Sequence, residues 1–198
     1  MVLLTAQVEI TRLVLDDPDA ALLQVSVVNA LNTLHESELL QARHAELLQR
    51  LSFDGCMPRD RAGRVVIPRQ LQLQMLQEGA TSADERLSLD SWVSACGDAP
   101  IRVDGEWVQA ESVWDRSECR LAIPDAERGQ RLVPTFRKAT ASLSFSVDEA
   151  MIDVATVARC LENALNLTGI GMLRPSFGRG RVLRIEHQSP GERGAAVA

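Results

Sequence analysis

The sequence lacks the short motifs that mark several common kinds of active site. No Gly-Lys-Ser/Thr follows a glycine-rich stretch, which excludes a Walker phosphate-binding loop. A Gly-x-Ser-x-Gly nucleophile elbow is also absent. Gly169 and Gly171 begin a partial dinucleotide fingerprint, but position 174 is arginine and a helix, not a strand, is predicted before them. With no recognisable catalytic motif, the protein is not expected to be an enzyme.

Clustered metal ligands and paired cysteines are missing as well. The four cysteines lie far apart, and none stands in a Cys-x-x-Cys pair. Zinc sites need clustered thiolate or imidazole ligands, and disulfide scaffolds are usually short and rich in cysteine. Asp16, Asp17 and Asp19 are more typical of a helix cap than of a metal site. We therefore expect reduced thiols, no metal and no cofactor. The cysteines are Cys56, Cys96, Cys119 and Cys160.

Long hydrophobic runs are absent too. No apolar run approaches the roughly 18 residues that suggest a membrane span. The N-terminal residues carry no basic region of the kind that begins a signal peptide. These absences predict a cytoplasmic protein without membrane contact.

The residues that are present predict an α+β fold. Apolar residues make up 45% of the 198, enough for one compact domain over residues 1–186. Residues 80–132 are predicted to be a loop-rich insertion, with a connector over 80–100, and residues 187–198 a flexible tail. Strands and helices alternate, which favours an antiparallel sheet with helices on one face. Strands are predicted over residues 2–15, 64–67, 140–147 and 181–186, a hairpin at Asp104-Gly105, and helices over 36–51, 69–78 and 148–167, while 20–34 fits either type.

Positive charge is concentrated in two segments of an acidic chain. The formal net charge is −6, yet residues 174–184 hold four arginines and no acid. Residues 59–69 hold four arginines against Asp60. This pattern indicates a basic stripe on an acidic body, not a surface that is basic throughout. The arginines are Arg174, Arg179, Arg181 and Arg184 in the first segment and Arg59, Arg61, Arg64 and Arg69 in the second.

Residues 169–182 combine glycines with arginines between a predicted helix and a predicted strand. Glycine lets a backbone approach a ligand closely, and successive backbone N–H groups can then meet phosphate oxygens. Arginine offers a forked donor for phosphate, and Phe177 offers a ring for stacking on a base. A second interpretation stays open. Gly169 can be a helix C-cap, Gly178 and Gly180 can shape a bulge, and the arginines can solubilise a strand edge.

The same segment resembles the C-terminal end of RAMP domains, the RRM-like modules of CRISPR RNA-binding proteins. The closer resemblance is to phage and mobile-element proteins similar to backbone subunits of CRISPR effector complexes. The resemblance implies a ferredoxin-like fold with insertions and a nucleic-acid-binding glycine-rich loop. It rests on Gly169-Ile170-Gly171, Arg174-Pro175, Phe177-Gly178-Arg179 and Val182, and more weakly on Gly63-Arg64-Val65-Val66-Ile67-Pro68.

Three functional hypotheses follow. The first is a subunit of a ribonucleoprotein or phage complex that binds the backbone of RNA or single-stranded DNA. The second is an assembly protein that uses the same fold for contacts with other proteins or with copies of itself. The third is an RNA endonuclease with His35 or His44 as general acid or base. The predicted nucleic-acid contacts are Gly169, Gly171, Arg174, Phe177, Gly178, Arg179, Gly180 and Arg181, extended by Arg61, Arg64 and Arg69.

The three tryptophans are predicted to fill or cover the core. Trp107 follows a strand that contains Arg102, and such a pair can line a groove for single strands. Burial is nevertheless the commoner fate of tryptophan in a protein of this composition. The residues are Trp92, Trp107 and Trp114.

Overall fold

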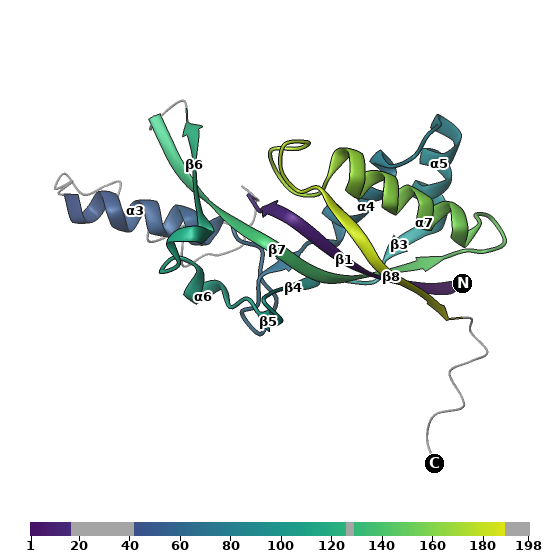
Figure 1. Cartoon of the computed structure of the whole chain (residues 1–198), viewed down its shortest axis with the longest axis horizontal. Coiled ribbons are helices and arrows are strands. Elements are labelled where there is room, and N and C mark those ends of the chain that lie inside the picture. The colour runs from purple at the N-terminus through teal and green to yellow at the C-terminus, as the bar shows by residue number, and fades with distance from the viewer. Residues whose placement is uncertain (17–41, 126–128, 189–198) are drawn as a thin grey trace, which may run out of the picture.

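The computed structural model of the chain describes residues 1–16, 42–125 and 129–188 (Figure 1). The segment 20–34, the first part of the helix predicted over 36–51, and His35 lie outside the described residues. The rest of that predicted helix is α3 (Ala42–Gly55).

One antiparallel sheet organises the molecule around two long strands, β1 (Val2–Val14) and β7 (Gly129–Val147). Val2 lies opposite Val147 at one end of the pair, and Val14 lies opposite Thr135 at the other. The main strand order is β2-β4-β7-β1-β8, with β3 and β6 on β7 and β5 on β4. The shorter strands are β2 (Val66–Ile67), β3 (Val93–Ala95), β4 (Ala99–Val103), β5 (Glu106–Trp107), β6 (Arg120–Asp125) and β8 (Gly180–Gln188).

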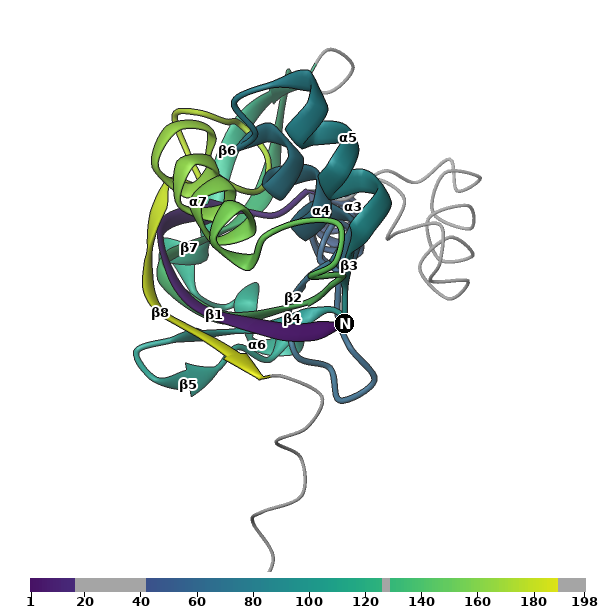
Figure 2. The same cartoon turned by 90° about the vertical axis from the view of Figure 1, so that its right-hand side faces the viewer.

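Three helices lie together on one side of this sheet (Figures 1 and 2). They are α4 (Arg69–Glu78), α5 (Ala83–Trp92) and α7 (Val154–Asn163), the last continued by a π-helical turn over Ala164–Thr168. Gly79 ends α4 against α7, where an added Cβ would lie 1.8 Å from the carbonyl oxygen of Cys160. The predicted α+β fold with an antiparallel sheet is thus confirmed.

Two short elements, α6 (Ala110–Val113) and a 3-10 turn (Ser117–Cys119), precede β6.

The helix-facing side of the sheet forms the hydrophobic core. Alternate residues of β1 are almost fully buried from Val2 to Ile10, as period-two alternation requires. Leu143 and Phe145 of β7 continue the same layer. Val157 and Leu161 close it from α7, because residues four apart lie on one face of a helix.

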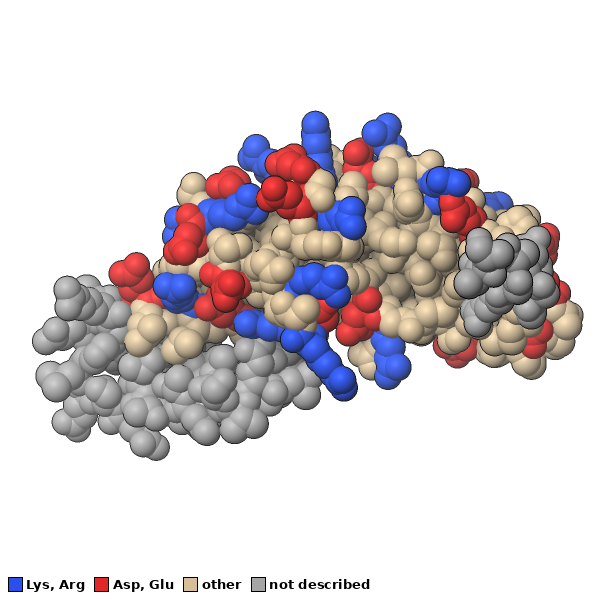
Figure 3. Space-filling model, turned by 90° about the horizontal axis from the view of Figure 1, so that it is seen from below, with Lys and Arg blue, Asp and Glu red and all other residues tan. Residues whose placement is uncertain are grey.

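The other side of the sheet carries polar side chains. Thr5 and Gln7 of β1 alternate with the buried residues, and Ser142 and Ser144 of β7 do the same. Figure 3 views the molecule from this side, opposite the three helices, and shows basic and acidic side chains interspersed among uncharged ones. We call this side the open face.

The prediction of a connector over residues 80–100 is wrong. The chain there forms α5 and then β3, which pairs with β7. Ser82 caps the helix by accepting a hydrogen bond from the Glu85 N–H at 3.2 Å. The Glu85 carboxylate accepts in return from the backbone and hydroxyl of Thr81, both at 2.8 Å. The signal was in the sequence, since a serine three residues before a glutamate is the sequence signature of a capping box.

Two other boundaries also differ from the prediction. The predicted loop-rich region, in which residues 121–123 were a possible strand, contains β6, which is longer than that and pairs with the first part of β7. The last helix begins at Val154 and not near residue 148, because Asp153 is its N-cap and accepts from the Ala155 N–H. Strand β8 extends through His187 and Gln188, which were assigned to the tail, and residues 189–198 lie outside the described residues.

No helix among the described residues is both long enough and apolar enough to span a membrane.

Replacing the helix cap tests the unpredicted helix. Ser82→Ala removes the acceptor for the Glu85 N–H and is expected to lower the free energy of unfolding by about 1 kcal/mol. Urea denaturation followed by circular dichroism measures this change. Ser91→Ala, in the same helix but without a side-chain hydrogen bond to a described residue, is the matched control. Equal stability of the two variants would contradict the capping assignment.

Candidate functional site

The glycine-rich segment after α7 folds back on itself and on the end of β1. The Ile170 N–H donates to the Gly178 carbonyl at 2.9 Å, and the Gly178 N–H donates to the Arg12 carbonyl. The Met172 N–H donates to the Val14 carbonyl at 2.9 Å. These three backbone N–H groups, in the segment where phosphate contacts were predicted, are therefore engaged inside the fold.

The glycines of this segment allow close backbone approach. Gly178 has φ +79°, and an added Cβ would lie 1.9 Å from the Ile170 carbonyl oxygen. At Gly171 the same addition would meet the Val14 carbonyl oxygen at 2.4 Å. Gly169 and Gly180 are similarly close to backbone atoms. The alternative interpretation, in which these glycines shape the chain and do not contact a ligand, explains their positions.

Three of the four arginines in residues 174–184 are bound to carboxylates. The Arg174 guanidinium donates to Glu78 at the end of α4, and both side chains are largely buried. Arg181 pairs with Glu9 of β1 at 3.0 Å. Arg184 pairs with Glu186 on the same strand at 2.6 Å. A neighbouring carboxylate offsets the positive charge of each of these arginines, which weakens its electrostatic attraction to an anionic ligand.

Arg179 is different, because it lies among other cations. Its carbonyl accepts from the Thr11 N–H at 2.9 Å, which places it beside β1. Arg12 of β1 in turn lies directly opposite Arg137 of β7. Backbone pairing therefore places Arg12, Arg137, Lys138 and Arg179 at neighbouring positions of three adjacent extended segments, and we call these four residues the basic cluster. All four side chains are exposed, and none forms an ion pair with a residue that the structure describes.

Two features of the basic cluster work against stability. Like charges directly opposite each other on paired strands are destabilising, and Arg12 faces Arg137 in this way. Lys138 has φ +51°, in the left-handed region that costs a non-glycine residue energy. Local costs of this kind concentrate at functional sites.

An aromatic ring lies next to the basic cluster. The Arg12 guanidinium carbon is 5.1 Å from the centroid of the Phe177 ring, within the range of a cation–π contact. Phe177 was predicted as a stacking residue, and the structure places it beside a cation that was not predicted.

The second arginine segment does not join the basic cluster as a set of free charges. Arg59 donates to the Asp54 carbonyl at 2.7 Å, and Arg64 pairs with Asp60 at 2.7 Å. Burial acts to raise the pKa of Asp60, but hydrogen bonds from Arg64 and from the backbone of Ala62 outweigh it and leave that pKa below its usual value.

The two remaining arginines of that segment are Arg61 and Arg69. Arg61 is exposed. Arg69 begins α4, and its backbone N–H donates to Asp98 at 2.9 Å.

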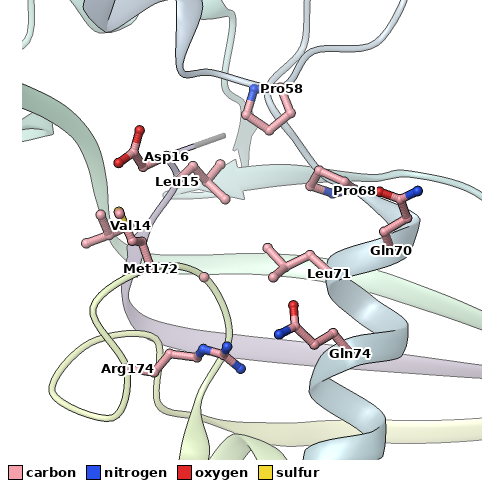
Figure 4. A pocket seen from close by; sticks show the side chains of 11 residues that line it. Val14, Leu15, Asp16, Pro58, Pro68, Gln70, Leu71, Gln74, Met172 and Arg174 are labelled. Carbon is pink, nitrogen blue, oxygen red and sulfur yellow. The ribbon is translucent and has the colours of Figure 1, made fainter. Parts of the chain in front are cut away.

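A hollow of about 290 Å³ lies between the glycine-rich segment and α4 (Figure 4). Gly171 and Arg174 line it from one side, and Gln70, Leu71 and Gln74 line it from the helix. Figure 4 shows Leu71 and Gln74 pointing into the space. Pro58 and Pro68 also line it, so the two arginine-bearing segments do approach each other here.

The charged side chains that line this hollow, Asp16 and Arg174, are already paired with residues outside its lining. Glu78 accepts from Arg174 and also from the Gln74 amide at 3.3 Å. Asp16 is bound by Arg131 on the far side. The hollow therefore offers no free charge of either sign from these groups.

A second hollow of about 310 Å³ lies on the open face. Trp107, Arg102 and Ser142 are among the residues that line it. The Arg102 guanidinium carbon is 3.8 Å from the Trp107 ring centroid, and that of Arg64 is 5.1 Å from it. Trp107 is 42% exposed and Trp92 is 38% exposed, so neither fills the core, whereas Trp114 is buried.

The predicted catalytic histidines are not located by the structure. His35 lies outside the described residues, and His44 lies in α3 with a side chain that is not described. His187 is exposed on β8. Within residues 1–16, 42–125 and 129–188, no three potential metal ligands come together.

No protein-family model matches the chain, and no curated protein matches it.

Sequence reasoning missed three of the four residues of the basic cluster. Arg12, Arg137 and Lys138 are isolated or paired cations within strands, and nothing along the chain links Arg12 to the other two. The available signal was the adjacent Arg137-Lys138, which precedes the most strongly alternating strand.

A methyl group at the glycine with the closest backbone approach in residues 169–180 tests the packing role of this segment. Gly178→Ala is expected to lower the free energy of unfolding by about 3 kcal/mol, because it combines a positive φ with a backbone clash. Gly97→Ala is the control, since an added Cβ there meets nothing within 4 Å. Thermal unfolding of both variants gives the comparison, and a Gly178→Ala protein as stable as the control would contradict the packing role.

The ion pair between Arg174 and Glu78 gives a second stability test. Arg174→Ala is expected to destabilise the fold by about 1–3 kcal/mol, since a largely buried carboxylate loses its charged partner. Denaturant titration measures the change, with Arg86→Ala, an exposed arginine on α5, as control. An unchanged midpoint for Arg174→Ala would show that the pair does not hold the segment to α4.

Proposed function

We propose that this protein is a single-stranded nucleic-acid-binding module, with RNA as the expected ligand, and that the basic cluster binds its phosphate backbone. The observation that carries the proposal is the cluster itself. Four exposed cations from three adjacent segments lack an acidic partner among the described residues, in a chain whose net charge is −6.

The dimensions of the basic cluster suit a single strand. Neighbouring strands of a sheet lie about 4.8 Å apart, so three adjacent segments span on the order of 10 Å before the long side chains extend further. That span accommodates a few phosphates. The interspersed acids on the open face would repel the many phosphates of a long duplex (Figure 3).

Stacking groups beside the cluster support the same ligand. Phe177 lies against Arg12, and both a phenyl ring and a guanidinium plane can stack on a base. Trp107, layered with Arg102, provides an exposed aromatic surface on the open face, whereas Phe177 is half-buried. Single-stranded RNA is commonly recognised through unstacked bases placed on such groups.

The topology supports a ferredoxin-like, RRM-like fold. Along the chain the elements β1, α4 with α5, β3, β7, α7 and β8 follow the β-α-β-β-α-β succession of such domains. The last strand lies beside the first, and β3 pairs with β7. On this proposal α3, β2, β4, β5, α6 and β6 are insertions, and the resemblance to RAMP domains favours a place in a CRISPR-related or phage complex.

Binding to phosphates should depend steeply on salt. We expect labelled single-stranded RNA to bind in fluorescence anisotropy, with affinity falling as ionic strength rises. Arg12→Ala, Arg137→Ala and Arg179→Ala should each weaken binding by about 5-fold and reduce the salt slope by about 0.7, the value for one contact with a single strand. Single-stranded DNA in parallel tests the choice of RNA.

Matched variants separate the basic cluster from other arginines. Arg86→Ala removes an exposed arginine on α5 and should leave affinity and salt slope unchanged. Arg174→Ala should change binding much less than Arg179→Ala, because Arg174 is held by Glu78. The proposal is wrong if wild-type protein does not bind RNA, or if binding is insensitive to salt. Cleavage of the probe would instead favour the endonuclease hypothesis.

A further inference from the structure

Strand β8 forms one margin of the sheet. It pairs with β1 along one edge, and no strand among the described residues pairs with its other edge. Figure 2 shows β8 along the outer side of the sheet, and in the strand order β1 separates it from β7. A free edge exposes backbone donors and acceptors that can pair with another strand.

The side chains at this edge are self-complementary. Arg184 lies opposite Gln7 and Glu186 opposite Thr5, so both belong to the open face. They are 65% and 46% exposed. When a second copy of the strand runs antiparallel, opposite charges two residues apart can each face the opposite charge on the other copy.

The complementarity selects one register. With a two-fold axis at Ile185, Arg184 of each copy lies opposite Glu186 of the other, which gives two favourable cross-strand pairs. An axis at position 184 would set Arg184 against itself, and an axis at position 186 would set Glu186 against itself. Like charges directly opposite are destabilising and opposite charges attract, so the axis at Ile185 is favoured over the axes at 184 and 186.

We propose that two copies of this chain associate through their β8 edges with the two-fold axis at Ile185. The two sheets then form one continuous antiparallel sheet with both open faces on the same side. Leu183, which is 49% exposed, lies just before this pairing and lines the hollow on the open face.

The association should be weak and dependent on concentration. A β-bulge where Gln7 and Val8 shift register limits the regular part of β8 to its second half. A pairing of so few residues buries less surface than a standard interface. The existing ion pair between Arg184 and Glu186 within one copy is exposed and contributes little, so exchanging it for pairs between copies costs little.

This inference does not rest on the proposed function. The basic cluster meets β8 only at its first residues, where Arg179 precedes Gly180, and the axis lies five residues further on. Loss of self-association and loss of RNA binding would therefore appear in different variants and in different measurements.

Exchange of the two charges tests the inference. Sedimentation equilibrium over a range of concentrations should show wild-type protein approaching twice the monomer mass. Arg184→Glu should weaken association by about 10-fold or more, because two attractive pairs become two repulsive ones. The double variant Arg184→Glu/Glu186→Arg should restore association to near the wild-type level.

Controls keep each outcome decisive. Arg86→Glu makes the same charge change on α5 and should leave the wild-type mass unchanged, and circular dichroism checks that every variant is folded. A wild-type protein that stays monomeric up to millimolar concentration overturns the inference. So does a dimer that Arg184→Glu does not weaken, or a double variant that stays monomeric.

Discussion

The pairing of β1 with β7 is the constraint on which the rest of the structure depends. It runs from Val2 opposite Val147 to Val14 opposite Thr135, and the other strands attach to its two outer edges, directly or through a neighbour. Its alternation sends apolar side chains to the helices and polar ones to the open face. A shift by one residue would reverse both faces, so this register decides where the core and any ligand surface lie.

The far end of β1 also decides what the glycine-rich segment does. The carbonyl groups of Arg12 and Val14 accept hydrogen bonds from that segment, and the glycines allow the approach. The backbone N–H groups of this segment that bond to β1 are therefore used within the fold, and only side chains of the segment can bind a ligand there. Among these, carboxylates hold Arg174, Arg181 and Arg184, whereas Arg179 has no acidic partner among the described residues and its backbone lies beside β1.

In an acidic chain, one concentrated basic cluster favours an anionic ligand that contacts only that small part of the surface. Exposed ion pairs contribute little to stability, and the arginines that take part in them carry little net field. Four unpaired cations in one place produce a local positive field that salt screens readily. A β8-edge dimer would place two such clusters on one continuous sheet, near opposite ends of the strand pair that joins the copies.

The sequence by itself determined the features that depend on near neighbours. The alternation of β1 and β7, the hairpin at Asp104-Gly105 and the bounds of α4 followed from it, and α5 could have been found from its capping pattern. Only the tertiary structure decided which arginines are neutralised, that Trp107 is exposed, and that Arg12 meets Arg137. The physical reason is range. Periodicity and capping act over a few residues, whereas the contact of Arg181 with Glu9 joins residues 172 positions apart.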